Sequence, residues 1–341
     1  MSMRWKNLLI GAFLLAFIAL LGGFNATKAR ILVLHTSDQS WLWANHVDEG
    51  IKQALDENRR PVSVKWHYLG LNRKLTADDR KSAELQARAA IDRIDPDVLI
   101  AVDDESNALV ARDYAGRQRP KLVFTAIVQP PERYGYSDAR NVSGIREQLP
   151  LAAARDALLA IRPGQATRIA ALAVNNETGR AQLEQVQAFD WAPYRLTLAE
   201  TVDNFVDWRA FVGRAAEQAD ILLVLIYRGL ERGDGDHQAV PGTEIVEWVE
   251  THSTLLPLGF PENYVGDGGG LGISPAAPDF GQSAMKMALR WLDQPAGSAA
   301  PQVTTSTHFR VGVRASRLAS RHLQLPPIYV EAAWLGNNYF P

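Results

Sequence analysis

The chain has 341 residues, of which 47% are hydrophobic and 22% charged, a globular composition long enough for two domains of ordinary size. Its formal net charge of −2 offers no basic surface for nucleic acid. The absence of cysteine excludes disulfides, thiolate metal sites and a cysteine nucleophile.

The chain begins with the pattern of a secretory signal. Arg4 and Lys6 precede an apolar run that extends from Leu8 to Leu21, and small residues follow at Thr27-Lys28-Ala29. We therefore expect residues 1–29 to be a signal peptide; an uncleaved anchor is the alternative, because a membrane span needs ~17–25 residues. A bacterial lipoprotein needs a cysteine after its cleavage site, so we expect a protein of a Gram-negative periplasm without a lipid anchor.

Beyond residue 30, short apolar runs alternate with amphipathic stretches. The predicted strands are 31–34, 62–68, 98–102, 122–127, 169–174, 196–200, 221–226 and 255–258. The predicted helices are 43–57, 81–94, 150–161, 179–189, 206–217, 243–252 and 278–292. Runs such as ILVL, VLIAV and ILLVLI are continuous, which is typical of parallel strands buried on both faces. This order predicts an α/β fold with doubly wound parallel sheets.

Two polar or glycine-rich stretches, residues 129–146 and 259–278, interrupt the alternation. They predict two lobes joined by hinges at 141–146 and 259–270. Lobe 1 is expected at 30–145 and lobe 2 at 146–268, with a return to lobe 1 at 269–300 and a closing segment at 301–341, mostly in lobe 2. Ligands of open α/β sheets bind beyond the carboxyl ends of the strands, so these ends are expected to face each other across a cleft.

The loop after the first strand is the first candidate site. Its polar groups would hold a ligand while a tryptophan stacks on it; the candidates are Ser37, Asp38, Gln39, Ser40 and Trp41. The alternative is a helix N-terminus capped by Ser40 or Asp38. Trp43 is expected to face the core.

Further candidates follow other strands. Asp103 and Asp104 offer a carboxylate for a ligand ammonium, or simply favourable charge at a helix N-terminus. Arg228 offers a guanidinium for a ligand carboxylate, with a surface arginine as the alternative. The remaining candidates are Thr125, Asn175, Tyr227 and Asp267, although Asp267 is better explained as part of a flexible hinge.

Motifs for catalysis or cofactors are missing from the sequence. The GDGGG stretch does not lie between a strand and a helix that carries Lys-Ser/Thr, so it is no phosphate loop. The histidines lack zinc spacing, and no Gly-x-Ser-x-Gly elbow occurs. A hydrolase that uses Asp103 or Asp104 with Glu105 is disfavoured, because adjacent side chains point apart. We expect no catalytic residue, no metal and no cofactor.

Four stretches resemble type 1 periplasmic binding proteins of ABC transporters, especially the tryptophan- and tyrosine-type branch and related exported sensor domains. They are ILVLHTSDQSWLWANHVDEGIKQAL, PKLVFTAIVQPPERYGYSDARNVSGI, GGGLGISPAAPDFGQSAMKMALRWLDQ and FRVGVRASRLASRHLQLPP. The resemblance implies a monomeric protein that holds a small polar, amino-acid-like ligand between its lobes, with an aromatic amino acid as one candidate. It also implies delivery to an ABC permease in the inner membrane. A ligand sensor that signals to a membrane kinase or cyclase is the alternative, and a sugar is the alternative ligand.

Overall fold

The computed structural model describes residues 28–71, 77–161, 167–295 and 297–341, together with residues 6, 10–17, 20 and 23. The predicted signal segment, residues 1–29, therefore lies largely outside the described residues. Within this segment, the described stretch 10–17 is helical and exposes apolar side chains such as Phe13 and Leu15. Within the described ranges, no helix is both long enough and apolar enough to span a bilayer.

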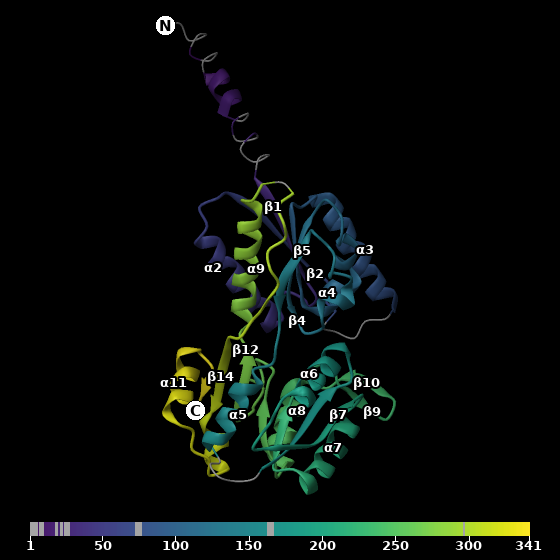
Figure 1. Cartoon of the computed structure of the whole chain (residues 1–341), viewed down its shortest axis with the longest axis vertical. Coiled ribbons are helices and arrows are strands. Elements are labelled where there is room, and N and C mark those ends of the chain that lie inside the picture. Colours follow the sequence, from purple (N-terminus) through teal and green to yellow (C-terminus); the bar gives the residue numbers. More distant parts are fainter. Residues whose placement is uncertain are drawn as a thin grey trace.

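The first sheet is entirely parallel and has the strand order β13-β5-β4-β3-β1-β2. Its strands are β1 (Ala29–His35), β2 (Val62–Tyr68), β3 (Val98–Val102), β4 (Lys121–Ile127), β5 (Val142–Arg146) and β13 (Thr304–Thr305). Helices α2 (Leu42–Asp56) and α9 (Ala277–Leu292) pack side by side on one face (Figure 1). The opposite face is covered by α3 (Ala77–Ile94), α4 (Asp103–Leu109) and the short 3-10 helices η1 (Ala111–Tyr114) and η2 (Pro131–Tyr134). We call this unit lobe 1.

The second sheet has the order β15-β14-β12-β11-β8-β6-β7. Its strands are β6 (Arg168–Val174), β7 (Arg195–Val202), β8 (Ile221–Val224), β11 (Leu256–Gly259), β12 (Leu271–Pro275), β14 (Phe309–Arg314) and β15 (Tyr339–Phe340). The sheet is parallel except at the β12–β14 pair, which is antiparallel, so the predicted doubly wound parallel sheet is present with β14 and β15 added in the opposite direction. An antiparallel neighbour needs no crossover helix, and the chain enters β14 directly from lobe 1. We call this unit lobe 2.

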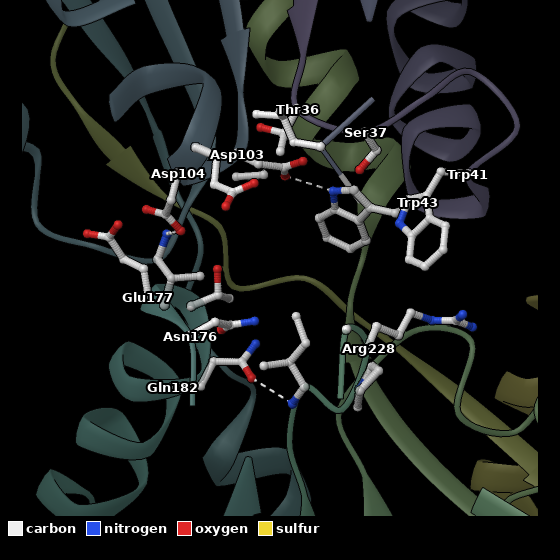
Figure 2. Close-up of a pocket in the computed structure, with 18 of the residues that line it drawn as sticks. Thr36, Ser37, Trp41, Trp43, Asp103, Asp104, Asn176, Glu177, Gln182 and Arg228 are labelled. Carbon is white, nitrogen blue, oxygen red and sulfur yellow. Dashed lines mark hydrogen bonds between the residues drawn. The ribbon is translucent and has the colours of Figure 1, made fainter. Parts of the chain in front are cut away.

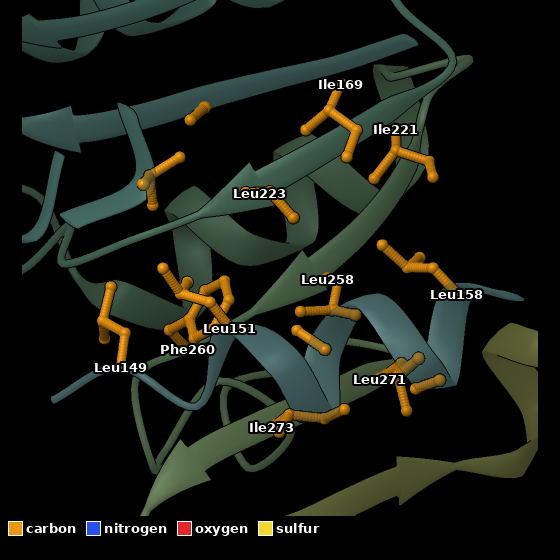
Figure 3. Close-up of a cluster of buried hydrophobic side chains, with 14 of the residues drawn as sticks. Leu149, Leu151, Leu158, Ile169, Ile221, Leu223, Leu258, Phe260, Leu271 and Ile273 are labelled. Atoms are coloured by element: carbon orange, nitrogen blue, oxygen red, sulfur yellow. The ribbon is translucent and has the colours of Figure 1, made fainter. Parts of the chain in front are cut away.

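Helices cover both faces of the second sheet. On one face, α5 (Leu151–Ile161) and α6 (Glu177–Ala188) bury apolar side chains against the strands, and Figure 3 shows Leu151 and Leu158 of α5 packed over the sheet. On the other face lie α7 (Phe205–Gln218) and α8 (Gly242–His252). The remaining elements are the hairpin β9 (Glu231–Gly233) and β10 (Asp236–Ala239), and the terminal helices α10 (Ala315–Ser320) and α11 (Pro327–Leu335).

The chain passes between the lobes three times: at residues 147–150, at Ala276, and at 306–308 (Figure 1). The predicted hinge at 259–270 is wrong, because this stretch joins β11 to β12 within the same sheet. The return to lobe 1 therefore starts with α9 rather than at residue 269. The sequence patterns missed β5 and β12 because both strands are short and contain glycine, yet both are almost wholly buried.

Helices α2 and α9 approach each other so closely that only glycine fits at the contact. A Cβ atom at Gly50 would lie 1.8 Å from the carbonyl oxygen of Pro278, and one at Gly281 would lie 1.9 Å from that of Val47. Lobe 1 is therefore held together by a backbone-to-backbone seam between segments that are far apart in the sequence.

Candidate ligand-binding site

A cavity of about 390 Å³ lies between the two lobes and is lined by residues of both (Figure 2). In lobe 1 its walls come mainly from the loops after β1 and β3, and in lobe 2 from those after β6 and β8. These are the neighbouring strands between which the strand order reverses in each sheet. Open α/β sheets leave a crevice at this position, so the topology itself creates the cavity.

The β1 loop contributes fewer residues to the cavity than the sequence predicts. Ser37 and Trp41 line it, whereas Asp38, Gln39 and Ser40 do not. Asp38 Oδ1 accepts hydrogen bonds from the backbone N–H of Ser40 (2.9 Å) and from its hydroxyl (2.5 Å). Neither residue caps α2, whose N-cap is Trp41 without a side-chain hydrogen bond. Asp38 and Ser40 therefore shape a turn that presents Trp41.

The two tryptophans of this region have different surroundings. The guanidinium of Arg228 from lobe 2 stacks on the face of the Trp41 ring, with its Cζ 4.5 Å from the ring centroid. Trp43 packs against Phe280 of the core, with ring centroids 5.9 Å apart, but it also lines the cavity, and its Nε1–H donates to Asp103 Oδ1 (2.9 Å). The prediction that Trp43 faces only the core is incomplete, because it stands in the first turn of α2, where the helix reaches the cavity.

Asp103 and Asp104 both line the cavity. Burial, together with the negative charges of Asp104 and Glu105, raises the pKa of Asp103 to about 7, although the hydrogen bond from Trp43 opposes this. Asp103 has φ of 66°, a conformation that is uncommon for non-glycine residues and clusters at functional sites.

Asp104 plays a different part. Its oxygens accept hydrogen bonds from Tyr134 Oη (2.6 Å) and from the backbone N–H groups of Val128 (3.1 Å) and Gln129 (3.0 Å). Burial raises its pKa, and these hydrogen bonds oppose the shift. Neither aspartate caps α4, whose N-cap is Val102. Asp104 therefore ties the loop after β4 to the cavity wall.

Arg228 lines the cavity, but its guanidinium is already engaged. Its Nη2 lies 2.8 Å from Asp267 Oδ2, the same oxygen that accepts from Tyr227 Oη (2.6 Å). In Figure 2 the Arg228 side chain extends away from the middle of the cavity, beneath Trp41. Asp267 and Tyr227 themselves do not line the cavity. The hypothesis that Arg228 offers a free guanidinium to a carboxylate does not match this geometry.

The other two predicted residues also lie outside the cavity. Thr125 is fully buried and donates to the carbonyl of Phe280 (3.1 Å), which ties β4 to α9. Asn175 donates to Asp203 Oδ1 (2.8 Å) on an exposed surface. Of the predicted residues, the structure thus brings Ser37, Trp41, Asp103, Asp104 and Arg228 together around the cavity.

Gln182, Glu147 and Glu262 line the cavity and were missed from the sequence, whereas Asn176 lies at the strand end beside the predicted Asn175. Asn176 lines the cavity while its Oδ1 caps α6 by accepting from the N–H of Gly179 (2.7 Å), and Gln182 accepts from the N–H of Ile226 (3.0 Å) (Figure 2). Glu147 and Glu262 follow β5 and β11 directly or closely. The signal for Glu147 was an acidic residue placed immediately after the first predicted hinge, at 141–146.

The lobes contact each other at opposite ends of the cavity. At one end, Glu177 Oε1 of lobe 2 pairs with Arg133 Nε (3.1 Å). At the other, besides the Trp41–Arg228 contact, His46 Nδ1 lies 2.9 Å from Glu262 Oε1. The hydrogen bond with Glu262 raises the pKa of His46, against the effect of burial. In this conformation the two lobes therefore contact each other on both sides of the cavity.

No protein-family model matches the chain, and no curated protein matches it in sequence. Several solved structures match it in fold. A domain of an ABC system in complex with L-Trp from Streptococcus pneumoniae superposes with a TM-score of 0.66 at 14% identity, covering 90% of this chain and 98% of the other.

Two further structures agree. A substrate-binding protein with adhesive properties from Clostridium difficile, in a ligand-free and open form, has a TM-score of 0.64 at 14% identity, covering 87% and 96% of the two chains. A leucine-binding protein from Thermotoga maritima has a TM-score of 0.54 at 15% identity, covering 78% and 83%. The chain thus has the two-lobed α/β fold of the type 1 periplasmic binding proteins.

Proposed function

We propose that this protein is an exported solute-binding protein that captures a small organic molecule between its lobes and delivers it to an ABC permease of the inner membrane. One observation carries the proposal: strand ends of both lobes line the same cavity, and in each lobe these ends lie where the strand order of the sheet reverses. A ligand bound there contacts both lobes and therefore favours their closed arrangement.

The lining suits an organic ligand with an apolar part. Alongside its polar groups, the cavity presents apolar side chains from both lobes, including Trp43, Val128, Ile226 and Phe260. A mostly apolar pocket of a few hundred Å³ with a few placed polar groups is the usual form of a small-molecule site. The fold neighbours named above include proteins described with L-Trp and as leucine-binding, and these descriptions support capture of a solute rather than its conversion.

The test is a thermal-shift screen of metabolites on residues 30–341, followed by X-ray scattering with the best hit. A ligand present at 100 times its dissociation constant adds about 2.7 kcal/mol of stability. Scattering of the saturated protein is expected to give a smaller radius of gyration than that of the free protein. A ligand that is chemically converted, or that leaves the scattering profile unchanged at saturation, argues against the proposal.

A pair of tryptophan variants places the ligand. Trp43→Ala removes a cavity wall and is expected to weaken binding by about 1–3 kcal/mol. The matched control is Trp334→Ala, because Trp334 lies on α11 of lobe 2 with 62% of its surface exposed and does not line the cavity. Equal effects of the two substitutions contradict the assignment of the cavity as the binding site.

A further inference from the structure

The cavity is strongly acidic. Among the described residues, its acidic lining side chains are Asp103, Asp104, Glu105, Glu147, Glu177, Glu231 and Glu262, whereas Arg228 and His237 are its basic ones. Most surface-exposed acidic side chains are solvated, so their presence does not indicate a ligand. The question is therefore which of these carboxylates already has a positive partner within the protein.

Four of the acids are paired with cationic or basic side chains. Glu105 pairs with Arg80 (2.9 Å), Glu177 with Arg133 (3.1 Å), Glu231 with His237 (2.6 Å), and Glu262 with Arg310 (2.8 Å). Both basic residues of the lining are also engaged, since Arg228 pairs with Asp267 and His237 with Glu231.

Asp103, Asp104 and Glu147 remain, and we call them the acid cluster. Asp104 is satisfied by three neutral donors, and Asp103 accepts one hydrogen bond from Trp43. Glu147 is 8% exposed and lines the cavity; no hydrogen bond or ion pair within the described ranges involves its carboxylate, whose oxygens are not wholly enclosed by the protein. Burial, together with the negative charges of Asp103, Asp104 and Glu262, raises the pKa of Glu147 well above its ordinary value. A buried carboxylate without a partner is unfavourable in its charged form, so it either takes up a proton or is compensated by a cation that binds there.

The missing partner is better explained as an organic cation than as a metal ion. In the part of the chain that the structure describes, no group of three or more His, Asp or Glu residues is placed to hold a metal ion. Beside the acid cluster stand Trp43 and the apolar side chains of the lining, which suit the hydrocarbon part of an organic molecule. An ammonium group has three N–H donors and is also attracted to the face of an indole ring.

We propose that the ligand is an organic amine that binds as an ammonium cation and carries no carboxylate, with its nitrogen held between Glu147 and Asp103. This inference rests on the proposed solute-binding function and narrows its ligand class. Glu147 supplies two free acceptor oxygens and Asp103 supplies its second oxygen, so three N–H donors meet three acceptors. A carboxylate on the ligand would meet the acid cluster and no unpaired cation among the described lining residues.

The experiment is calorimetry with three probes that share one ring: tryptamine as the cation, L-tryptophan as the zwitterion and indole-3-propionate as the anion. An aliphatic pair, 1,5-diaminopentane and 1,5-pentanediol, makes the comparison without a ring. In at least one set, we expect the amine to bind at least tenfold more tightly than its partners. The inference is overturned if no amine binds, or if in every set whose amine binds, the zwitterion, anion or diol binds within tenfold of that amine.

Two isosteric variants complete the test. Glu147→Gln is expected to lower the affinity for the amine at least tenfold. Glu200→Gln is the control for loss of one negative charge, because Glu200 lies on β7 outside the cavity and pairs with Arg214 (2.7 Å); it is expected to leave the affinity unchanged. Equal effects of the two variants overturn the inference.

The outcomes separate the inference from the proposed function. If L-tryptophan or another uncharged or zwitterionic solute binds and closes the lobes while amines do not, the solute-binding function stands and the amine inference fails. If neither the amines nor any metabolite of the screen binds, both fail.

Discussion

Glu147 and Glu250 are buried to the same extent, each with 8% of its surface exposed, but the protein treats them differently. Around Glu250, lobe 2 supplies the backbone N–H of Gly270 (2.8 Å), Tyr264 Oη (3.1 Å) and the guanidinium of Arg321 (3.4 Å). Around Glu147, between the lobes, the described residues supply nothing to the carboxylate. Glu250 thus joins parts of one lobe, whereas Glu147 is left available to a molecule from outside.

The comparison separates two uses of buried charge. A carboxylate that its own lobe satisfies fixes structure, and its loss leaves donors without a partner. A carboxylate that nothing satisfies destabilises the empty protein, and it is retained where binding needs it. Strained or unpaired groups of this kind concentrate at binding sites, where a group that is needed for binding lowers the stability of the empty protein.

The largest expected effect concerns the stability of the empty protein. Because the folded-state pKa of Glu147 is raised above its ordinary value of 4.5, the native state binds a proton that the unfolded chain has lost, and stability falls as pH rises through this window. Glu147→Gln is therefore expected to stabilise the empty protein by about 1–3 kcal/mol at pH 8, with the gain disappearing near pH 4.

The matched variant sharpens the comparison. Glu250→Gln leaves Arg321 without its anion and is expected to destabilise the protein by a similar amount, about 1–3 kcal/mol. Urea unfolding of both variants at pH 8 and pH 4 measures the difference. If both substitutions destabilise the protein at pH 8, the distinction between the two glutamates is wrong.

The second effect is the pH dependence of amine binding. Burial raises the pKa of Asp103 to about 7, so an ammonium ion must displace a proton from it below that pH. The charged groups that face Asp103 are Asp104 and Glu105 from α4 and Glu147 from the first crossing, with the indole N–H of Trp43 from α2. All three charges are negative, so none of them removes the effect.

Tryptamine stays protonated across this range, since alkylammonium groups titrate near pH ~10. Its affinity is expected to fall by up to about tenfold per pH unit as Asp103 takes up its proton below pH 7, and Glu147, whose pKa is also raised, adds a further loss wherever it is protonated. Asp103→Asn should keep the hydrogen bond from Trp43, lower the affinity at pH 8 and remove the step near pH 7. Calorimetry at pH 6, 7 and 8 checks this, and an affinity of the wild type that is flat over the range breaks the argument.

The smallest effect is expected at Arg228. Lysine at this position keeps the charge beside Asp267 but gives up the planar stacking on Trp41, a contact that contributes about 0.5–1 kcal/mol. Arg228→Lys is therefore expected to lower the affinity for the amine by no more than about threefold, because one contact between the lobes is lost. A loss of tenfold or more would mean that Arg228 holds the ligand itself, as the original amino-acid hypothesis requires.

Much of the fold could be predicted from the sequence, because continuous apolar runs mark buried parallel strands. Strand β2 and strand β3 were predicted with the bounds that the structure shows. Strand β12 was not, because its Gly272 and Pro275 are turn residues by composition, and only its neighbours in the sheet make it a strand. Local patterns carry no information about such long-range pairing.

The site was harder to predict than the fold. The strand ends chosen from the sequence include Asp103 and Trp41, which line the cavity because the topology brings these ends together; that they bind a ligand stays a prediction. The ion-pair partner of each charged side chain could not be predicted from the sequence. Arg228 pairs with Asp267, which lies 39 residues away along the chain. The Glu147 carboxylate is identified as unpaired only in the structure, from the absence of a donor among the described residues around it. Pairing of charges depends on tertiary distances, whereas sequence patterns record only spacing along the chain.

The seam at Gly50 and Gly281 has a consequence for the rates of binding. Trp41 caps the N-terminus of α2, and Trp43 and His46 lie in its first turns beside the cavity. The close backbone contact between α2 and α9 prevents this end of α2 from moving independently of lobe 1. We therefore expect a bound molecule to leave by separation of the lobes, which breaks the Trp41–Arg228, His46–Glu262 and Arg133–Glu177 contacts, rather than by movement of α2. We therefore expect the residence time of the ligand to follow the opening rate of the whole molecule, largely independent of which amine is bound.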